Sequence, residues 1–520
     1  MNYADLFRVT LPETALEVAA LVVLVVDLAF LRKAALKVRV AVAALLGVAG
    51  CGAALWAISI QTGSGLFGND FLLLTVGGSS AVAQVGILIL TATTLLLQID
   101  STFTKHVGEY VAVVLMAASG GLLIASAQDL LVIFVGLELL SLGLYILTAF
   151  AKSSGKSAEA AMKYYLFGGM SAAFLLFGFS YFYGLTGYTN LQAIELTIFQ
   201  TGPTPLFYVA WILVVAGLGF KIAAVPFHLW APDTYEGAPA PAAAFIASVS
   251  KVASFTLLLN ICHEWMVYGG EHGFDKASND WFFHHAAQIW APLITTLLVI
   301  AAASMIVGNL AALAQTSVRR LLAYSAIAHA GYILLGIAIF PRFFDGSQDY
   351  LSNAIPPDHS TNAVLYYVLT YGLTVIGAFG VVSVVERATG SDKLDSFLGL
   401  HKRNPLLAAV LLVLFLSLAG IPPLVGFWAK FNLFAAVLGV SAGPVPFALV
   451  SLAIALSVVS LYYYLQVLKR VHVMPAIDQM PIKAHPVTLS ALLLIAAAVV
   501  VLGCFPALLM RWIESFYHVM

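Results

Sequence analysis

The sequence predicts an all-α polytopic membrane protein with about fourteen transmembrane helices. Of its 520 residues, 61% are hydrophobic and only 9% are charged. Soluble domains carry about 25% charged residues, so this composition excludes a soluble protein. The net charge of −1 gives no electrostatic reason to bind nucleic acid. The three cysteines lie far apart in apolar runs, without the spacing of a disulfide framework, a zinc site or an iron–sulfur site.

The helices are predicted from runs of about 20 apolar residues, each long enough to cross a bilayer. The first run, from about Ala15 to Leu31, lacks the basic segment of a cleaved signal peptide, so we expect it to be retained. An even number of spans would place both termini on one side. The fourteen runs are centred near residues 23, 49, 89, 117, 139, 176, 214, 250, 300, 331, 375, 416, 456 and 497.

The basic residues predict the orientation of these spans. Cytoplasmic loops of membrane proteins are rich in lysine and arginine. One set of alternate loops, from Arg32 to Lys483, holds sixteen of the 24 basic residues. The opposite side holds four, namely Arg8, Lys276, Arg342 and Arg511. We therefore expect a multi-pass protein of the inner (plasma) membrane with both termini on the external, periplasmic side.

Two spans are interrupted by glycine and proline, and each carries a lysine beside the interruption. The seventh reads AGLGFKIAAVPFHLW, with Lys221 before Pro226, and the twelfth reads LAGIPPLVGFWAKF, with Lys430 after Pro423. They are five spans apart and so run in opposite directions. Paired interruptions of this kind indicate inverted repeats around a site at the membrane midplane, although prolines are also common in ordinary membrane helices.

We therefore predict one integral membrane domain with two inverted five-helix repeats, spans 4–8 and 9–13, and broken helices 7 and 12. The predicted parts are N-terminal helices 1–3 in residues 1–108, a first repeat in 109–262, a second repeat in 290–470 and a C-terminal helix in 485–520.

Charged residues inside the spans are the candidate functional residues. A lysine or aspartate at the centre of a membrane helix costs roughly 2.5–3.5 kcal/mol on insertion scales, and such residues commonly mark ion paths. Of the acids, only Asp27 and Glu138 lie well inside a span. Glu138 has a functional interpretation as a buried carboxylate and an alternative one as a hydrogen-bonding group that only fixes helix packing.

Four lysines lie in or at the start of apolar runs. Lysine removed from water can take up and release a proton near neutral pH, which exposed lysine cannot. The alternative is that the side chain extends to the membrane surface. That alternative is strong for Lys163, harder to exclude for Lys430, and weaker for Lys221 and Lys251, which lie deeper.

Two histidines complete the candidate set, since histidine titrates near neutral pH and can relay protons between lysines. His329 lies in RRLLAYSAIAHAGY, and His228 lies between Pro226 and Pro232. Either could instead be a neutral histidine bonded to a carbonyl. Asp233 and Glu236, in PDTYEG, are interpreted as cap, turn or interface charges. No motif that would bind NAD, flavin, haem or a cluster is visible.

These segments resemble the subunit N family of proton-translocating NADH–quinone oxidoreductase (respiratory complex I), equivalent to subunit 2 of the mitochondrial enzyme and to its chloroplast counterpart. The resemblance covers essentially the whole chain. Lysine at position 430 favours subunit N over the related subunit M, which usually has glutamate there, and subunit L would be longer. The segments that carry the resemblance are LPETALEVAALVVLVVDL, DLLVIFVGLELLSLGLYIL, EAAMKYYLFGGMSAAFLLFGFSYFYGLTG, GFKIAAVPFHLWAPDTYEGAPAPAAAFIASVSK, RRLLAYSAIAHAGY and GIPPLVGFWAKF.

The resemblance implies a role for each candidate residue. Glu138 matches the glutamate of the fifth helix, which is expected to pair with Lys221 on the broken seventh helix. Lys251 matches the connecting residue of the eighth helix, and Lys430 matches the outward-side proton site of the twelfth. His329 matches the histidine of the motif AYSSI-H-GY, in which Ala326 replaces the usual serine.

The resemblance further implies proton translocation as one subunit of an NADH:quinone oxidoreductase, a translocase whose electron transfer takes place elsewhere in the complex. It implies that NADH, FMN, iron–sulfur clusters and quinone are bound by other subunits and that no cofactor or metal is bound here. The implied partners are the antiporter-like subunit M, the small subunits K, J, A and H, and the lipid bilayer. A subunit of a cation/proton antiporter and a purely structural spacer of the membrane arm are the alternatives, and the buried charges argue against the spacer.

Overall fold

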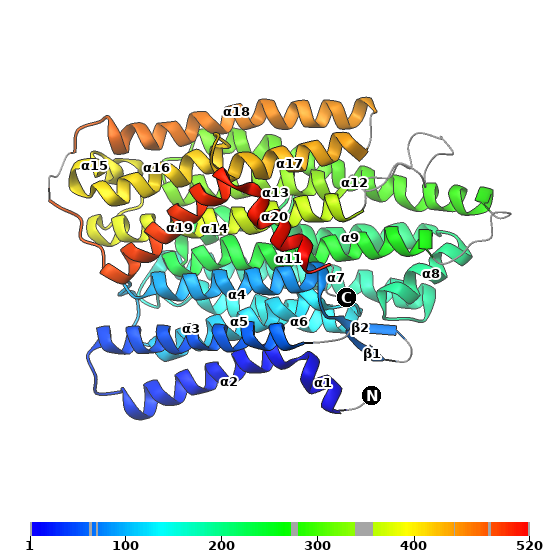
Figure 1. Ribbon diagram of the computed structural model, residues 1–520, viewed down its shortest axis with the longest axis horizontal. Helices are drawn as coiled ribbons and strands as arrows, with labels where there is room; N and C mark the ends of the chain where they lie inside the picture. Colours follow the sequence, from blue (N-terminus) through cyan, green and yellow to red (C-terminus); the bar gives the residue numbers. More distant parts are fainter. Residues whose placement is uncertain are drawn as a thin grey trace.

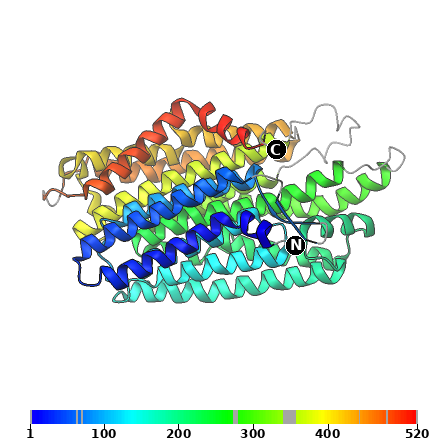
Figure 2. The same ribbon diagram turned by 60° about the horizontal axis from the view of Figure 1, so that its bottom comes forward.

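The computed structural model describes residues 3–61, 65–68, 71–271, 279–338, 357–440, 443–476 and 480–517. Lys276 and Arg342, two of the basic residues assigned to the external side, lie outside these ranges. The long helices run side by side along the long axis of the molecule, and both termini lie toward the same end of the bundle (Figures 1 and 2). An even number of spans requires this placement of the termini.

The described residues form twelve helices that are long and apolar enough to cross a membrane. Their number and apolar character confirm the predicted polytopic membrane fold. They are α3 (Leu36–Ile60), α4 (Gly78–Gln98), α5 (Val107–Ser126), α6 (Leu130–Thr148), α7 (Gly155–Thr186), α9 (Pro205–Ile222), α11 (Ala240–Glu271), α12 (Asn279–Leu313), α13 (Val318–Ala338), α14 (Pro357–Thr389), α18 (Pro444–His472) and α19 (Pro486–Cys504).

Two further predicted spans are composite. The first consists of α2 (Leu11–Val25) and the π-helical turn η1 (Val26–Phe30) that continues it. The twelfth is divided into α16 (Pro405–Ala419) and α17 (Val425–Val440). The seventh span is interrupted as well, because α9 ends at Ile222 and the short helix α10 (Trp230–Gly237) begins eight residues later. Both interruptions lie at the prolines from which they were predicted.

Several short elements were not predicted. A two-stranded antiparallel hairpin, β1 (Gly65–Gly68) and β2 (Phe71–Thr75), lies between α3 and α4 and is a small departure from an all-α chain. The C-terminal unit has two helices, since Pro506, which lacks an amide hydrogen, begins a new helix after α19. The others are α1 (Tyr3–Val9), α8 (Leu191–Thr201), α15 (Leu400–Arg403), the 3₁₀ turn η3 (Leu394–Phe397) and α20 (Pro506–Ser515).

Asp27, one of the two acids expected inside a span, is held by an arginine. It lies in η1, and its two carboxylate oxygens accept bonds of 2.7 and 2.6 Å from Arg39 at the beginning of α3. The amide of Gly108, on α5, donates a third bond of 3.1 Å to Asp27. A bidentate bond to arginine compensates the buried charge, so the structure explains Asp27 as a link between the first, second and fourth spans.

Loops that were predicted to share the basic face lie together at one end of the bundle. Arg387, at the end of α14, pairs with Asp100 in the loop before α5 and donates to the carbonyl of Lys483 before α19. The amide of His485 also donates to Asp100, at 3.0 Å. These contacts join three loops that are far apart in the sequence, as alternation of the spans requires.

Candidate functional site

The break in the seventh span places Lys221 in the last turn of α9. Ala223 ends the helix with φ 59°, in the left-handed region that usually requires glycine. A non-glycine residue there costs roughly 1–2 kcal/mol. Lys221 is only 7% exposed, and its Nζ donates a 2.5 Å bond to the hydroxyl of Ser141 on α6. The amide of Val225, released by the break, donates to Ser304 of α12 at 2.9 Å.

Glu138 lies one turn before Ser141 on α6, but it is not in contact with Lys221. Its side chain is half-buried, whereas the sequence suggested a buried carboxylate. Within the described part of the chain, no ion pair within 4.0 Å involves Glu138, although its charge interacts with Lys221 over a longer distance. The direct partner of Lys221 is therefore Ser141, and not Glu138 as expected.

Lys251 lies in the middle of α11, the helix that packs at the centre of the bundle. It is 2% exposed, and its Nζ donates a 2.6 Å bond to the backbone carbonyl of Ala326 on α13. The ammonium also lies 5.8 Å from the centre of the Tyr371 ring on α14, within the range of a cation–π interaction. The contact with position 326 uses the main chain, so alanine in place of the usual serine leaves it intact.

Lys430 is bound by the interrupted twelfth span. The last carbonyls of a helix lack intrahelical partners and carry partial negative charge, which attracts cations. The Nζ of Lys430 on α17 donates to the carbonyls of Leu418 and Ala419 at the end of α16, at 3.2 and 3.1 Å, and to the hydroxyl of Ser457 on α18 at 2.8 Å. The break therefore creates the binding site for the lysine.

Two glycines permit this close packing. Gly420 ends α16 with φ +87°, and a Cβ there would lie 3.3 Å from the Lys430 Nζ. A Cβ at Gly426 would lie 1.8 Å from the carbonyl oxygen of Ser417, so any larger residue would displace α17 from α16.

His329, on α13, lies between Lys251 and Lys430. One of its ring nitrogens, Nδ1, is 2.8 Å from the hydroxyl of Tyr367, and its ring lies 4.8 Å from that of Tyr371 and 5.7 Å from that of Tyr332. Tyr371 is the ring beside Lys251, and Tyr332 lies 5.4 Å from the Nζ of Lys430. The tyrosines thus connect the histidine to both lysines.

A small cavity lies beside His329. Its volume is about 10 Å³, and it lies among α13, α14, α16 and α17. Its polar lining consists of the side chains of His329, Tyr367, Thr370, Tyr371, Thr374 and Ser417. A cavity of this size has room for about one water molecule, which the hydroxyl groups around it could bond.

A network of hydroxyl groups that the sequence did not predict surrounds these residues. Asn309 of α12 donates to Tyr332 at 3.1 Å and accepts from Tyr463 of α18 at 3.2 Å. Tyr464, the next residue, shares a hydrogen bond with Ser325 of α13. A buried tyrosine usually places its hydroxyl on a polar partner, so tyrosines and an asparagine inside apolar spans were the available signal.

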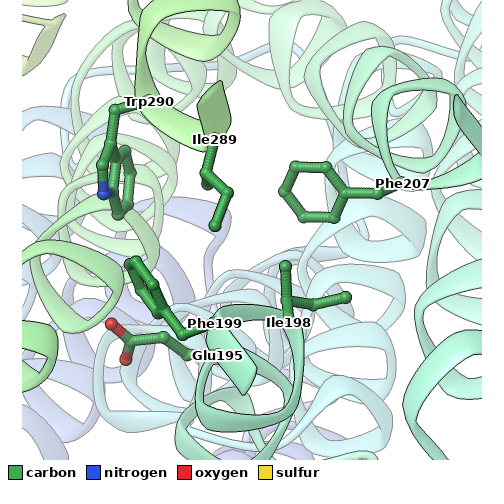
Figure 3. Close-up of a pocket in the computed structure, with 6 residues that line it drawn as sticks. All are labelled: Glu195, Ile198, Phe199, Phe207, Ile289 and Trp290. Atoms are coloured by element: carbon green, nitrogen blue, oxygen red, sulfur yellow. The ribbon is translucent and has the colours of Figure 1, made fainter. Parts of the chain in front are cut away.

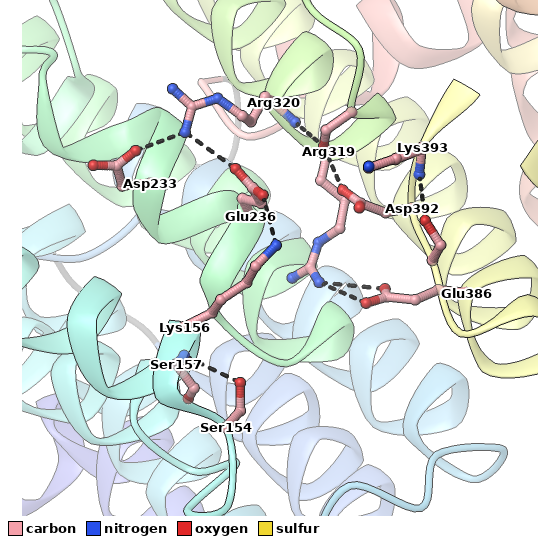
Figure 4. A network of polar contacts seen from close by, with 12 residues as sticks. Ser154, Lys156, Ser157, Asp233, Glu236, Arg319, Arg320, Glu386, Asp392 and Lys393 are labelled. Carbon is pink, nitrogen blue, oxygen red and sulfur yellow. Dashed lines mark hydrogen bonds and ion pairs between the residues drawn. The ribbon is translucent and has the colours of Figure 1, made fainter. Parts of the chain in front are cut away.

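The remaining predicted residues lie outside this group. His228 is half-buried in the break between α9 and α10, and contacts none of the three lysines or His329. Lys163, on α7, forms 2.7 Å ion pairs with Asp233 and Glu159 and is not isolated in the membrane. Asp233 and Glu236 form ion pairs within the chain: both bind Arg320 of α13, at 2.6 and 3.1 Å, and Glu236 also binds Lys156 (Figure 4).

A second cavity, of about 10 Å³, contains none of the candidate residues. It is lined mainly by apolar and aromatic side chains of α8, α9 and α12, with Glu195 at its rim (Figure 3).

In the described ranges, no three histidine, cysteine, aspartate or glutamate side chains are grouped as a metal site would require. The buried lysines, His329 and the hydroxyl groups are therefore the arrangement to explain, and they can bind and pass on protons.

Comparisons with known proteins agree on one family. Residues 127–270 and 281–459 match the family described as NADH:quinone oxidoreductase/Mrp antiporter, TM. NADH-quinone oxidoreductase subunit N 2 of Acidobacterium capsulatum is 48% identical over 525 residues, which cover 99% of each chain.

Two solved structures contain chains with the same fold as this one. A chain of respiratory complex I from Thermus thermophilus with bound aureothin is 32% identical, with a TM-score of 0.74 over 96% of this chain and 98% of that one. A chain of the Mrp complex from Dietzia sp. DQ12-45-1b has the same TM-score over 97% and 96% of the two chains, but at 20% identity it shows the fold alone. The chain belongs to the subunit N family of NADH–quinone oxidoreductase, the proton-translocating, antiporter-like membrane subunits of respiratory complex I.

Proposed function

We propose that protons cross this subunit along the series Lys221, Lys251, His329 and Lys430, with Glu138 and His228 acting at the end nearest Lys221. The observation that carries the proposal is the binding of the three lysines. Each is at least 93% buried, and the closest partner atoms are neutral oxygens of hydroxyl or carbonyl groups. In the part of the chain that the structure describes, none forms an ion pair with a carboxylate. An ammonium without a counter-ion can release its proton at low cost.

The two inverted repeats remain part of this proposal. The spans from α5 to α11 include one broken helix, α9–α10, and those from α12 to α18 include the other, α16–α17. Each break has a lysine beside it, and Lys251 and His329 lie between the two breaks along the chain. We infer that each repeat contributes one half of the path, and that the two halves meet near Lys251 and His329.

We infer that NADH, FMN, iron–sulfur clusters and quinone are bound by other subunits, since no motif for them is present in this chain. The inferred neighbours are subunit M and the small subunits K, J, A and H. A role in a cation/proton antiporter is the alternative, supported by the fold shared with the Mrp complex. The identity of 48% over almost the whole length of a subunit N favours complex I. Purification through a tag on this chain should recover NADH:quinone oxidoreductase activity.

The experiment on the path is replacement of His329 by leucine. Because His329 is the group that lies between Lys251 and Lys430, we expect NADH-driven proton pumping in membrane vesicles to fall several-fold. His401→Leu is the matched control, since His401 contacts the Val471 carbonyl at 3.0 Å, away from the lysines. Full pumping by the His329 variant would contradict the proposed path.

The orientation is proposed from the basic residues and can be tested by labelling. A cysteine at Lys393, which is exposed, should react with an impermeant thiol reagent only from the cytoplasm, and one at Arg511 only from outside. Cys504 is exposed and must be replaced first, whereas Cys51 and Cys262 are buried. Labelling from the reversed sides would overturn the orientation.

A further inference from the structure

A second group of ionisable residues lies in the N-terminal helices, outside the path described above. Glu13, in the first turn of α2, is only 7% exposed and faces α4 and α5. Gln84 of α4 approaches it, with its Nε2 3.4 Å from Oε1 of Glu13 and 3.3 Å from the Leu122 carbonyl of α5. Glu17, one turn further along α2, accepts a 3.2 Å bond from Ser119 of α5.

No cation in the described part of the chain compensates these carboxyl groups. Within the described ranges, neither Glu13 nor Glu17 has a lysine, arginine or histidine within 4.0 Å, and Oε2 of Glu13 has no hydrogen-bond partner at all. The same run of helix provides the contrast, since Asp27 is buried to a similar degree but is bound by both donors of Arg39. A buried carboxylate without a cation or full hydrogen bonding is costly, whereas the neutral acid is much less so.

The charged groups on the neighbouring elements lie elsewhere. Arg8, on α1, is exposed, and α4 has no charged residue. The basic residues of α3 and the acid of α5, namely Lys37, Arg39 and Glu109, lie in the first turns of those helices, at the Asp27 end. Fourteen residues of helix separate Asp27 from Glu13, or about 21 Å at 1.5 Å per residue. Of the charged residues named here, Glu17 alone lies within about one turn of Glu13 on the same helix.

We propose that Glu13, surrounded by Gln84, Glu17 and Ser119, is a proton-binding site that takes up and releases a proton during turnover. A role as a simple helix cap is the alternative, because glutamate in a first helical turn can bond the free amides there. The Glu13 carboxyl also interacts with its own backbone amide, as a cap would, but the geometry favours the proton site, since Glu13 in addition contacts Gln84 on another helix and leaves its second oxygen unbonded in the interior.

The site is coupled by packing to the helix of Lys251. Both α4 and α5 pack against α11, and Asn260 of α11 links them: it accepts a 3.1 Å bond from Ser79 of α4 and donates a 3.0 Å bond to the Ala125 carbonyl of α5. A shift of α11 would therefore move the helices that carry Gln84 and Ser119. The inference rests on the proposed path to the extent that Lys251 takes part in it.

The test is NADH-driven proton pumping, relative to quinone reduction, by the assembled complex. Glu13→Gln should lower this ratio several-fold, because glutamine keeps the shape but cannot exchange a proton. The exchanged variant Glu13→Gln with Gln84→Glu returns one carboxyl group to the same contact and should restore the ratio. Thr14→Val is the matched control, since the hydroxyl of Thr14 bonds only the Thr10 carbonyl at 2.8 Å and should not affect pumping.

Each other result would overturn the proposal. Normal pumping by Glu13→Gln would make the carboxyl group dispensable. A defect that the exchanged variant does not restore, including failure of both variants to assemble, would assign Glu13 to capping, since a carboxyl group on α4 cannot cap α2. A defect that varies with sodium concentration at constant ionic strength would indicate a cation site instead. Lys430→Ala, measured alongside, tests the lysine path independently of Glu13.

Discussion

Replacement of Lys430 by alanine is expected to lower proton pumping coupled to quinone reduction by about ten-fold, equivalent to roughly 1.4 kcal/mol in the barrier. The change removes the ammonium that joins the end of α16 to α18. Its three acceptors, the carbonyls of Leu418 and Ala419 and the hydroxyl of Ser457, then lose their donor. Pumping can be followed in membrane vesicles with a pH-sensitive dye, next to the rate of NADH oxidation.

Lys430→Arg separates proton transfer from fixed charge. Arginine supplies the same charge to the same oxygens, but it does not release its proton in proteins, so pumping should remain impaired. Ser457→Ala is the control, because it removes one of the three acceptors and leaves the lysine in place, and its effect should be small. Full pumping with arginine would show that position 430 needs only a positive charge, and the assignment as a proton site would fail.

Glu138→Gln and Lys221→Ala are each expected to lower pumping strongly, and the double variant should be little worse than either. The charges of Glu138 and Lys221 interact, so removing either one removes the same interaction. The expected coupling in activation free energy is about 0.5–3 kcal/mol, the range found for residues in one network. Proton pumping by the two single variants and the double variant, in the same vesicle assay, gives this value.

Ser141 supplies a second measurement on the same pair. It accepts the bond from Lys221 and lies one turn after Glu138 on α6. Ser141→Ala should weaken the coupling, because it removes the direct link of the ammonium to α6. If the losses of the single variants simply add in the double variant, the two residues act independently. The proposal that Glu138 acts together with Lys221 would then be wrong.

The membrane fold follows from the sequence because its determinants are local. Apolar runs of about 20 residues can satisfy their backbone hydrogen bonds in a bilayer only as helices, so composition alone predicted the spans. Pro226 and Pro423 cannot continue a helix, and both breaks lie at these residues. Lys221, Lys251 and Lys430 were recognisable because a lysine in an apolar run is costly wherever the chain folds.

The partners of these lysines were decided by the tertiary structure. Ser141 lies 80 residues from Lys221, and Ala326 lies 75 residues from Lys251. Such contacts depend on how helices pack and rotate against one another, which no local pattern specifies. For the same reason the sequence did not show which groups the tyrosine hydroxyls around His329 contact, and it predicted a buried Glu138 where the structure has a half-buried one. The sequence by itself determined which groups are costly to bury, because that cost belongs to the residue and its span. Only the tertiary structure decided which oxygen, ring or charge compensates each of them, because that compensation is made between helices.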